Sequence, residues 1–237
     1  MLINNKNIAD YGIEILDKKV NTSSFSTTKN WSNQALTPIL INKKFTYGSM
    51  ELTLLISCKL EKDIKTTKSN FIMNISESII KDDDFYYKVT LNSVADGEEV
   101  FKNKLNGMYC EKFSINLIID EKYKEEIIKD ITLSNNKFII NVEGNTETPC
   151  ILEIVPSQAM VDLVIQGVTE NPIKVNDISI NSSLVINGED EIITLNGANK
   201  FSDSDMWAFP VLKPGENEIT FSKNYFNGKI KYKPRFI

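Results

Sequence analysis

The last residues of the chain alternate strictly between charged and apolar side chains, and this period of two constrains the fold more than any other feature. Side chains of a β-strand point alternately to opposite faces, so residues 229–236 predict a strand with one basic and one apolar face. Proline has no N–H to donate, so Pro234 predicts that this strand lies at the edge of an antiparallel sheet. The basic face carries Lys229, Lys231, Lys233 and Arg235, and the apolar face carries Ile230, Tyr232 and Phe236, with Pro234 in register.

Turn signals divide the C-terminal part of the chain into short segments. Residues 213–217, Lys-Pro-Gly-Glu-Asn, predict a turn, because proline presets one dihedral and glycine permits the left-handed conformation that follows. Asn227-Gly228 is the strongest short hairpin signal of the chain. Evenly spaced strands between such turns are typical of a β-sandwich or jelly roll. The expected strands span residues 138–142, 150–155, 161–166, 173–180, 183–186 and 191–195.

The N-terminal part combines strands with one helix. Apolar residues at three- and four-residue spacing after Thr66 and Thr67 predict an amphipathic helix over about residues 67–80, with a threonine as its cap. Residues 21–33 are rich in Ser, Thr and Asn and predict a loop that holds Trp31. The charged stretch 120–130 fits either a short helix or a crossing loop. The expected strands span residues 39–45, 49–60, 85–91 and 109–119.

These patterns predict a mainly β protein with two β-sandwich-type domains. From about residue 136 onward, the sequence predicts short strands at regular intervals. We therefore expect an N-terminal domain over residues 1–135, which carries the helix, and a C-terminal domain over residues 136–237. A chain of 237 residues suits this division, and it buries enough surface to fold without disulfides.

The composition excludes several classes of function. The chain has no histidine, which removes Ser-His-Asp and Cys-His mechanisms, histidine metal sites and histidine proton transfer. A net charge of -5 argues against a dedicated nucleic-acid binder. Cys58, Cys110 and Cys150 are odd in number and widely spaced, which indicates reduced thiols. We expect no signal peptide, no membrane segment and a protein made in the cytoplasm.

Two acidic runs invite a chemical interpretation. Residues 82–84, Asp-Asp-Asp, lack the donor order of a calcium loop, so a solvated turn is favoured over a cation site. Residues 189–191, Glu-Asp-Glu, follow Asn187-Gly188 and are adjacent in sequence, whereas glycoside hydrolysis needs two carboxylates held apart across a cleft. A hairpin tip is the favoured interpretation. No catalytic, cofactor-binding or metal-binding residue is assigned, and an enzyme is not expected.

Aromatic and basic residues offer two further candidates. Trp31, Trp207, Tyr225 and Phe226 are candidates for a sugar-stacking platform. Trp207 lies in an apolar stretch that favours the core, whereas Tyr225 and Phe226 lie near the expected hairpin tip and are the better candidates for an exposed contact. The four cations of the last strand suit either an acidic or phosphate partner or protection of an exposed sheet edge, which is favoured.

Four stretches of the chain, in this order and spacing, resemble distal tail proteins of siphovirus-type bacteriophages. Each motif is short, and together the four span nearly the whole chain. They are Ile-Ala-Asp-Tyr-Gly-Ile at residues 8–13, the expected helix with Asp-Phe-Tyr-Tyr-Lys-Val at 84–89, Val-Glu-Gly-Asn-Thr-Glu-Thr-Pro-Cys-Ile-Leu-Glu-Ile at 142–154, and Leu-Lys-Pro-Gly-Glu-Asn-Glu-Ile-Thr-Phe with the terminal strand at 212–236.

The resemblance implies a structural protein of the virion tail tip. It implies that the first domain closes into a homohexameric ring and that the second is a galectin-like β-sandwich, a term that describes a fold and not sugar binding. The implied partners are the tail tube protein, the tail-tip or tail-associated lysin protein and receptor-binding proteins. The implied place is the virion, after assembly in the host cytoplasm. No cofactor is implied.

Two elements are candidates for contacts between subunits of such a ring. The polar segment 21–33 and the hairpin at Asp96-Gly97 have too few apolar residues to hold themselves in place. The alternative function is a stand-alone carbohydrate-binding β-sandwich, in which the C-terminal domain binds sugar. An enzyme is a third class, which the missing histidine disfavours.

Overall fold

The structure is a computed structural model that describes residues 1–30, 39–97, 100–103 and 106–237. It is mainly β, as predicted, and its described residues form one α-helix. Contacts divide the chain into an N-terminal unit, Met1–Lys122 with Ile237, and a C-terminal unit, Tyr123–Phe236. This division precedes the expected boundary at residues 135 and 136. The reason is that β11 (Ile127–Asp130) is hydrogen-bonded to β22 (Phe226–Tyr232) of the second unit.

The N-terminal unit is built on one sheet with strand order β2-β1-β7-β8-β10-β6-β3, and β9 also pairs with β10. Strands β6 (Gly48–Cys58) and β10 (Tyr109–Tyr123) pair without interruption from Cys58 and Tyr109 to Gly48 and Ile119. Their buried side chains alternate with half-buried or exposed ones, so one face of the sheet carries the core. The other strands are β1 (Leu2–Ile3), β2 (Lys6–Asn7), β3 (Ile13–Asn21), β7 (Glu77–Asp82), β8 (Phe85–Asp96) and β9 (Phe101–Lys102), and a 3-10 turn η1 spans Ile8–Tyr11.

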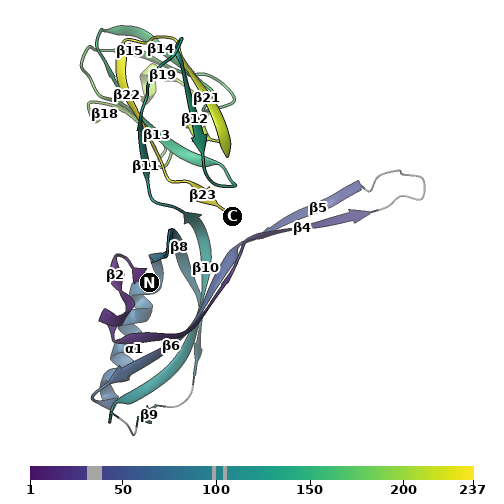
Figure 1. The fold of residues 1–237 in the computed structure, drawn as a ribbon, viewed down its shortest axis with the longest axis vertical. Coiled ribbons are helices and arrows are strands. Elements are labelled where there is room, and N and C mark those ends of the chain that lie inside the picture. The colour runs from purple at the N-terminus through teal and green to yellow at the C-terminus, as the bar shows by residue number, and fades with distance from the viewer. Residues whose placement is uncertain (31–38, 98–99, 104–105) are drawn as a thin grey trace. The chain divides into compact units, whose positions relative to one another are not determined.

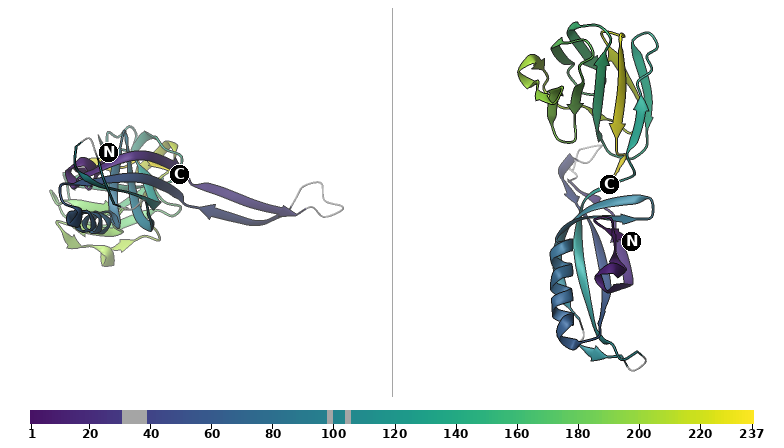
Figure 2. Two further views of the ribbon diagram at one scale, coloured as in Figure 1. Left: turned by 90° about the horizontal axis from the view of Figure 1, so that it is seen from below. Right: turned by 90° about the vertical axis from the view of Figure 1, so that its left-hand side faces the viewer.

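One helix, α1 (Glu61–Ile75), lies along this sheet (Figure 2, right). The expected helix over 67–80 begins too late and ends too late. Acidic Glu61 and Asp63 occupy the first turn of the helix, where their negative charges interact favourably with the helix dipole. Thr67, the expected cap, lies inside the helix, and its hydroxyl contacts the Cys58 sulfur at 3.6 Å. Ile79 belongs to β7 and is 42% exposed, because Ser78 and Ile80 take the buried positions of that strand.

A second correction concerns the expected loop at residues 21–33. Strand β4 (Ser24–Asn30) pairs with β5 (Ile39–Thr46) from Ser24 and Thr46 outward, and together they form a two-stranded sheet of their own. Polar side chains are compatible with this hairpin because its backbone groups are satisfied by each other. Figure 1 draws the hairpin as two long strands. Trp31 and the rest of residues 31–33 lie outside the described residues.

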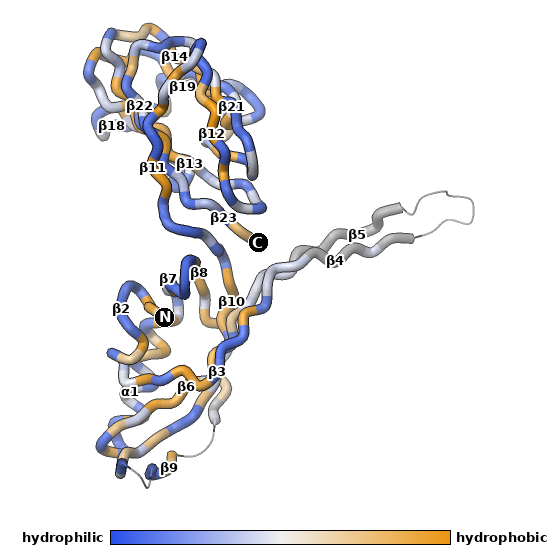
Figure 3. The backbone as a smooth tube through the Cα atoms, viewed as in Figure 1, coloured by the Kyte–Doolittle hydropathy of each residue, from blue (hydrophilic) through white to orange (hydrophobic). Residues whose placement is uncertain are grey.

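The C-terminal unit has two sheets that enclose one core, as the predicted sandwich requires. Their strand orders are β11-β22-β13-β16-β17-β18 and β12-β21-β14-β15-β19, and β20 pairs with β13. Apolar and polar residues alternate along these strands (Figure 3), and Leu152, Ile165 and Ile230 are fully buried. The bounds are β12 (Lys137–Val142), β13 (Thr148–Pro156), β14 (Met160–Gln166), β15 (Ile173–Ile178), β16 (Leu184–Asn187), β17 (Ile192–Leu195), β18 (Ala198–Asn199), η2 (Phe201–Asp203), β19 (Ser204–Asp205), β20 (Val211–Leu212), β21 (Gly215–Phe221) and β23 (Arg235–Phe236).

Three expectations for this unit are wrong, and two of them share one cause. Strand β22 is not an edge strand, because β11 covers the side that was expected to be open. The stretch 120–130 forms no helix: β10 extends to Tyr123, β11 takes up residues 127–130, and only residues 124–126 connect the two strands. Asn227-Gly228 lies inside β22 and forms no turn. An added Cβ at Gly228 would come within 3.0 Å of the Ile131 and Phe226 side chains, which explains a glycine there.

Candidate functional site

Both acidic runs form turns. Asp82 ends β7 and is ion-paired with Lys18, and Asp83 adopts a left-handed conformation (φ 52°) before β8 begins. Glu189, Asp190 and Glu191 connect β16 to β17, where the Asn187 side chain accepts hydrogen bonds from the backbone N–H groups of Glu189 and Asp190. Each run therefore has a local structural role.

No group of three or more His, Cys, Asp or Glu side chains within the described residues is arranged to hold a metal ion. In the same part of the chain, no helix has the length and apolar character to cross a membrane. Cys110 and Cys150 are buried and Cys58 is half-buried, all as free thiols. Burial raises the pKa of the Cys150 thiol well above its usual range.

The aromatic candidates are placed differently from the expectation. Trp207 is 84% exposed and does not belong to the core, because only Val211 and Leu212 of its apolar stretch form a strand. Tyr225 and Phe226 are half-buried and pack against the core, and the Phe226 ring lies 5.1 Å from that of Phe221. The expected exposed platform at these two residues is therefore absent from the described fold.

Two of the four cations of the expected last strand are ion-paired with carboxylates of the same unit. The Lys231 ammonium lies 2.5 Å from a Glu153 oxygen, and the Lys233 ammonium lies 3.0 Å from a Glu189 oxygen. Burial lowers the pKa of Lys233, but the hydrogen bond to Glu189 and its charge outweigh this effect, so the pKa lies above its ordinary value. Because β22 is an inner strand, the interpretation of Lys229 and Lys231 as edge protection is wrong.

Two hollows open on the C-terminal unit. One, of about 480 Å³, lies where β11, β13 and β22 meet. In it Lys229 stands opposite Asp130 on one neighbouring strand and opposite Glu153 on the other. Opposite charges across a sheet attract, so the polar groups of this hollow largely compensate one another.

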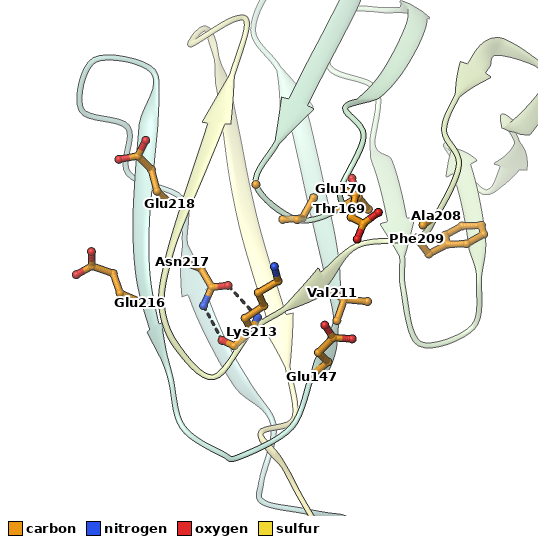
Figure 4. A pocket seen from close by; sticks show the side chains of 12 residues that line it. Glu147, Thr169, Glu170, Ala208, Phe209, Val211, Lys213, Glu216, Asn217 and Glu218 are labelled. Carbon is orange, nitrogen blue, oxygen red and sulfur yellow. Dashed lines mark hydrogen bonds between the residues drawn. The ribbon is translucent and has the colours of Figure 1, made fainter. Parts of the chain in front are cut away.

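The other hollow, of about 440 Å³, lies beside β20 and β21 (Figure 4). Apolar Val168, Phe209 and Val211 line it, together with four glutamates and a single lysine, Lys213. The Asn217 side chain stiffens one wall: its amide oxygen accepts from the Lys213 N–H at 2.9 Å, and its amide nitrogen donates to the Lys213 carbonyl at 2.8 Å.

Sequence reasoning did not single out the glutamates of this hollow. Glu147 precedes β13, Glu170 follows β14, and Glu216 and Glu218 lie on β21. The fold brings them together from segments that are up to about 70 residues apart, and no spacing in the sequence signals such a grouping.

Comparisons with known proteins agree with the fold described above. A family model described as "Siphovirus-type tail component, C-terminal domain" matches residues 143–236. No curated protein matches the chain. The crystal structure of SPP1 Dit, described as a paradigm of the hub adsorption apparatus in phages that infect Gram-positive bacteria, is similar with a TM-score of 0.77 and 12% identity. That match covers 100% of this chain and 98% of SPP1 Dit.

Chains of the phage P2 baseplate in its activated conformation are also similar. With Ca the TM-score is 0.56 at 12% identity, and with Sr it is 0.54 at 13% identity. Both matches cover 98% of this chain and 94% of the other. Residues 143–236 therefore match the siphovirus-type tail component family, and the fold of the chain is similar to that of SPP1 Dit, which agrees with the resemblance to distal tail proteins.

Proposed function

We propose that this protein is a structural component of a phage tail and forms the hexameric hub of a siphovirus tail tip. In this role six copies close into a ring at the end of the tail tube and join it to the tail-tip or tail-associated lysin protein and to receptor-binding proteins. The observation that carries the proposal is the fold likeness to SPP1 Dit over 100% of this chain. The family match of residues 143–236 supports it independently.

Exposed apolar side chains of the N-terminal unit also support assembly. Tyr47, which lies between β5 and β6, is 61% exposed, and Met73 on α1 is 73% exposed. Large apolar side chains that lie in solvent in one copy are suited to burial against a neighbour. The β4–β5 hairpin, which forms its own two-stranded sheet, is a second candidate for such a contact. The residues after Gly97, in the other proposed contact, are partly outside the described chain.

The ring is tested on the purified protein and on the virion. Light scattering after size-exclusion chromatography is expected to give six times the mass of one chain, and electron microscopy is expected to show rings. Antibody labelling of virions assembled in the host cytoplasm is expected to mark the tail tip. A protein that stays monomeric at high concentration and is absent from the tail tip would contradict the proposal.

The proposed function makes and breaks no covalent bond, and the alternative remains a stand-alone carbohydrate-binding module. That alternative relied on exposed Tyr225 and Phe226, both of which pack against the core. We therefore expect a glycan array to show no binding that Tyr225→Ala removes. Binding lost in that variant, with its folded state shown by circular dichroism, would favour the carbohydrate module.

A further inference from the structure

The hollow beside β20 and β21 differs from its neighbour in how its charges are balanced. Glu218 is ion-paired with Lys137 at 2.8 Å. Glu147, Glu170 and Glu216 are exposed, and none of them forms an ion pair with a residue in the described part of the chain. In the hollow at β22, by contrast, Glu153 is paired with Lys231. The unit thus pairs Glu153 of one hollow with a lysine. It leaves Glu147, Glu170 and Glu216 of the other without an ion pair among the described residues, and Lys213 is the one lysine that lines that hollow.

Apolar surface accompanies these free carboxylates. Ala208 and Phe209 line the hollow, and Trp207, at 84% exposure, directly precedes them. The Phe209 ring stacks on Phe201, with ring centroids 6.5 Å apart and an angle of 27° between the rings. Phe201 is itself 53% exposed. A large exposed indole next to stacked rings marks a contact surface, since solitary apolar side chains are ordinary but clusters are not.

The arrangement of the charges indicates the chemistry of the occupant. In Figure 4 the side chains of Glu147 and Glu170 lie on either side of Val211, between the acidic and the aromatic parts of the hollow. A guanidinium group forms paired hydrogen bonds with a carboxylate and also stacks on aromatic faces, so it suits both parts. An ammonium group satisfies only the charge, as a point donor.

We propose that this hollow, together with Trp207, is the docking surface for an arginine-containing basic segment of another protein. Its volume of about 440 Å³ admits a few side chains and a short stretch of backbone, not a folded domain. The Asn217 hydrogen bonds hold the wall at Lys213 and Gly215 before binding, which reduces the ordering that the contact requires. The docking surface lies within the C-terminal unit and does not depend on a ring.

The test measures binding of a defined probe to the full chain. The probe is a terminally blocked peptide of alternating arginine and glycine, and its control replaces each arginine with citrulline, which has the same shape without the charge. Trp207 fluorescence reports binding in a Trp31→Phe background. The arginine peptide is expected to change the fluorescence and the citrulline peptide is not. Binding is expected to weaken as salt rises from about 50 to about 300 mM, because screening shortens the range of the charges.

Variants assign the contact to these residues. The double variant Glu147→Gln with Glu170→Gln is expected to lower the affinity for the arginine peptide roughly tenfold. This is about the effect of losing two exposed ion pairs. Glu191→Gln, an exposed residue of the same unit outside the hollow, is the matched control and is expected to leave binding unchanged. For Trp207→Ala, binding is followed by calorimetry in place of fluorescence, and a weaker affinity is expected.

Three outcomes would overturn the proposal. One is no binding of the arginine peptide at about 1 mM. Another is equal binding by the wild type and the double glutamine variant, with both folded by circular dichroism. The third is binding of a neutral oligosaccharide that Trp207→Ala removes, without binding of the arginine peptide; this would assign the surface to a glycan. A monomeric protein that binds the peptide would disprove the ring and leave the docking surface in place.

Discussion

The two units bury the apolar faces of their sheets in different ways. The C-terminal unit closes two sheets on each other, and side chains from both fill one core. The N-terminal unit covers one face of a single sheet, in part with α1, and sends a separate two-stranded hairpin out of the sheet between β3 and β6. The two sheets of the second unit thus cover each other, whereas β4 and β5 of the first unit pair only with each other in the described chain.

The largest expected effects come from matched cavities in the two cores. Leu52 in β6 and Leu152 in β13 are both fully buried leucines on inner strands, one in each unit. Each change to alanine is expected to lower the free energy of unfolding of its own unit by about 2 to 5 kcal/mol. Differential scanning calorimetry is expected to show two transitions, of which each variant shifts one. A single transition that both variants shift together would show that the units unfold as one.

Two glycines with left-handed backbone give the next largest contrast. At Gly167 (φ 91°) an added Cβ would come within 2.1 Å of the Glu218 carbonyl oxygen, whereas at Gly12 (φ 73°) the nearest atom is a Thr67 methyl at 4.0 Å. Gly12→Ala is expected to cost about 1 to 2 kcal/mol from backbone strain alone. Gly167→Ala adds a backbone collision and is expected to cost roughly 3 kcal/mol or more. Equal costs in chemical denaturation would show that β21 moves away freely.

A smaller effect is expected in alkali, and it acts on both units. The hydrogen bond to Asp82 raises the pKa of Lys18 despite partial burial, and burial raises the pKa of Tyr87 above its ordinary 10.0. In the C-terminal unit the pKa values of Lys233 and Tyr232 are also raised. A raised folded pKa means that the folded state holds its proton longer, so this stability is complete below pH about 10 and is lost as the pH rises further.

Methionine variants distinguish the contributions of the Lys18 and Lys233 ion pairs to stability in this alkaline range. Lys18→Met and Lys233→Met are expected to remove under about 1 kcal/mol each below pH 10, since both lysines are partly exposed to solvent. Each variant is expected to flatten the fall in stability of its own unit between pH about 9.5 and about 11.5. Melting temperatures measured across this range check the result, and an unchanged slope in either unit would show that its lysine does not contribute.

The smallest expected effect on stability comes from removal of the hairpin. Replacing residues 24–46 with Asn-Gly joins Ser23 to Tyr47 next to the pair formed by Asn21 and Ser49, where a two-residue turn fits. The free energy of unfolding of the N-terminal unit is expected to change by less than about 0.5 kcal/mol, because β4 and β5 pair only with each other in the described chain. Self-association, measured by light scattering, is expected to decrease. A large loss of stability would show that the hairpin supports its own unit.

Local patterns in the sequence predict which residues form a strand and which of them are buried, but they do not predict which strands pair with each other. Alternation in residues 229–236 correctly indicated that Ile230, Tyr232 and Pro234 are buried. The same residues carry no information about which strand lies alongside, so β22 was placed at an edge that β11 in fact covers. A charged four-residue strand such as β11 has no period long enough to recognise. Its strand conformation depends on pairing with a segment about 100 residues away.

The two candidate surfaces show the same limit. Trp207 was placed in the core because Phe209, Val211 and Leu212 follow it, but the buried Pro210 separates the exposed loop from the short strand β20. The glutamates of the acidic hollow each look like an ordinary surface residue in sequence. Only the folded chain shows that they line one hollow, in which Glu147, Glu170 and Glu216 form no ion pair with a described residue.

The β4–β5 hairpin continues the same pair of chain segments that form β3 and β6. Asn21 pairs with Ser49 in the sheet, and Ser24 pairs with Thr46 at the base of the hairpin. Strand β6 in turn is bonded along its length to β10 and packs under α1. A mechanical force on the hairpin would therefore pass along the covalent chain into β3 and β6, and through β6 to the strand and the helix that contact it.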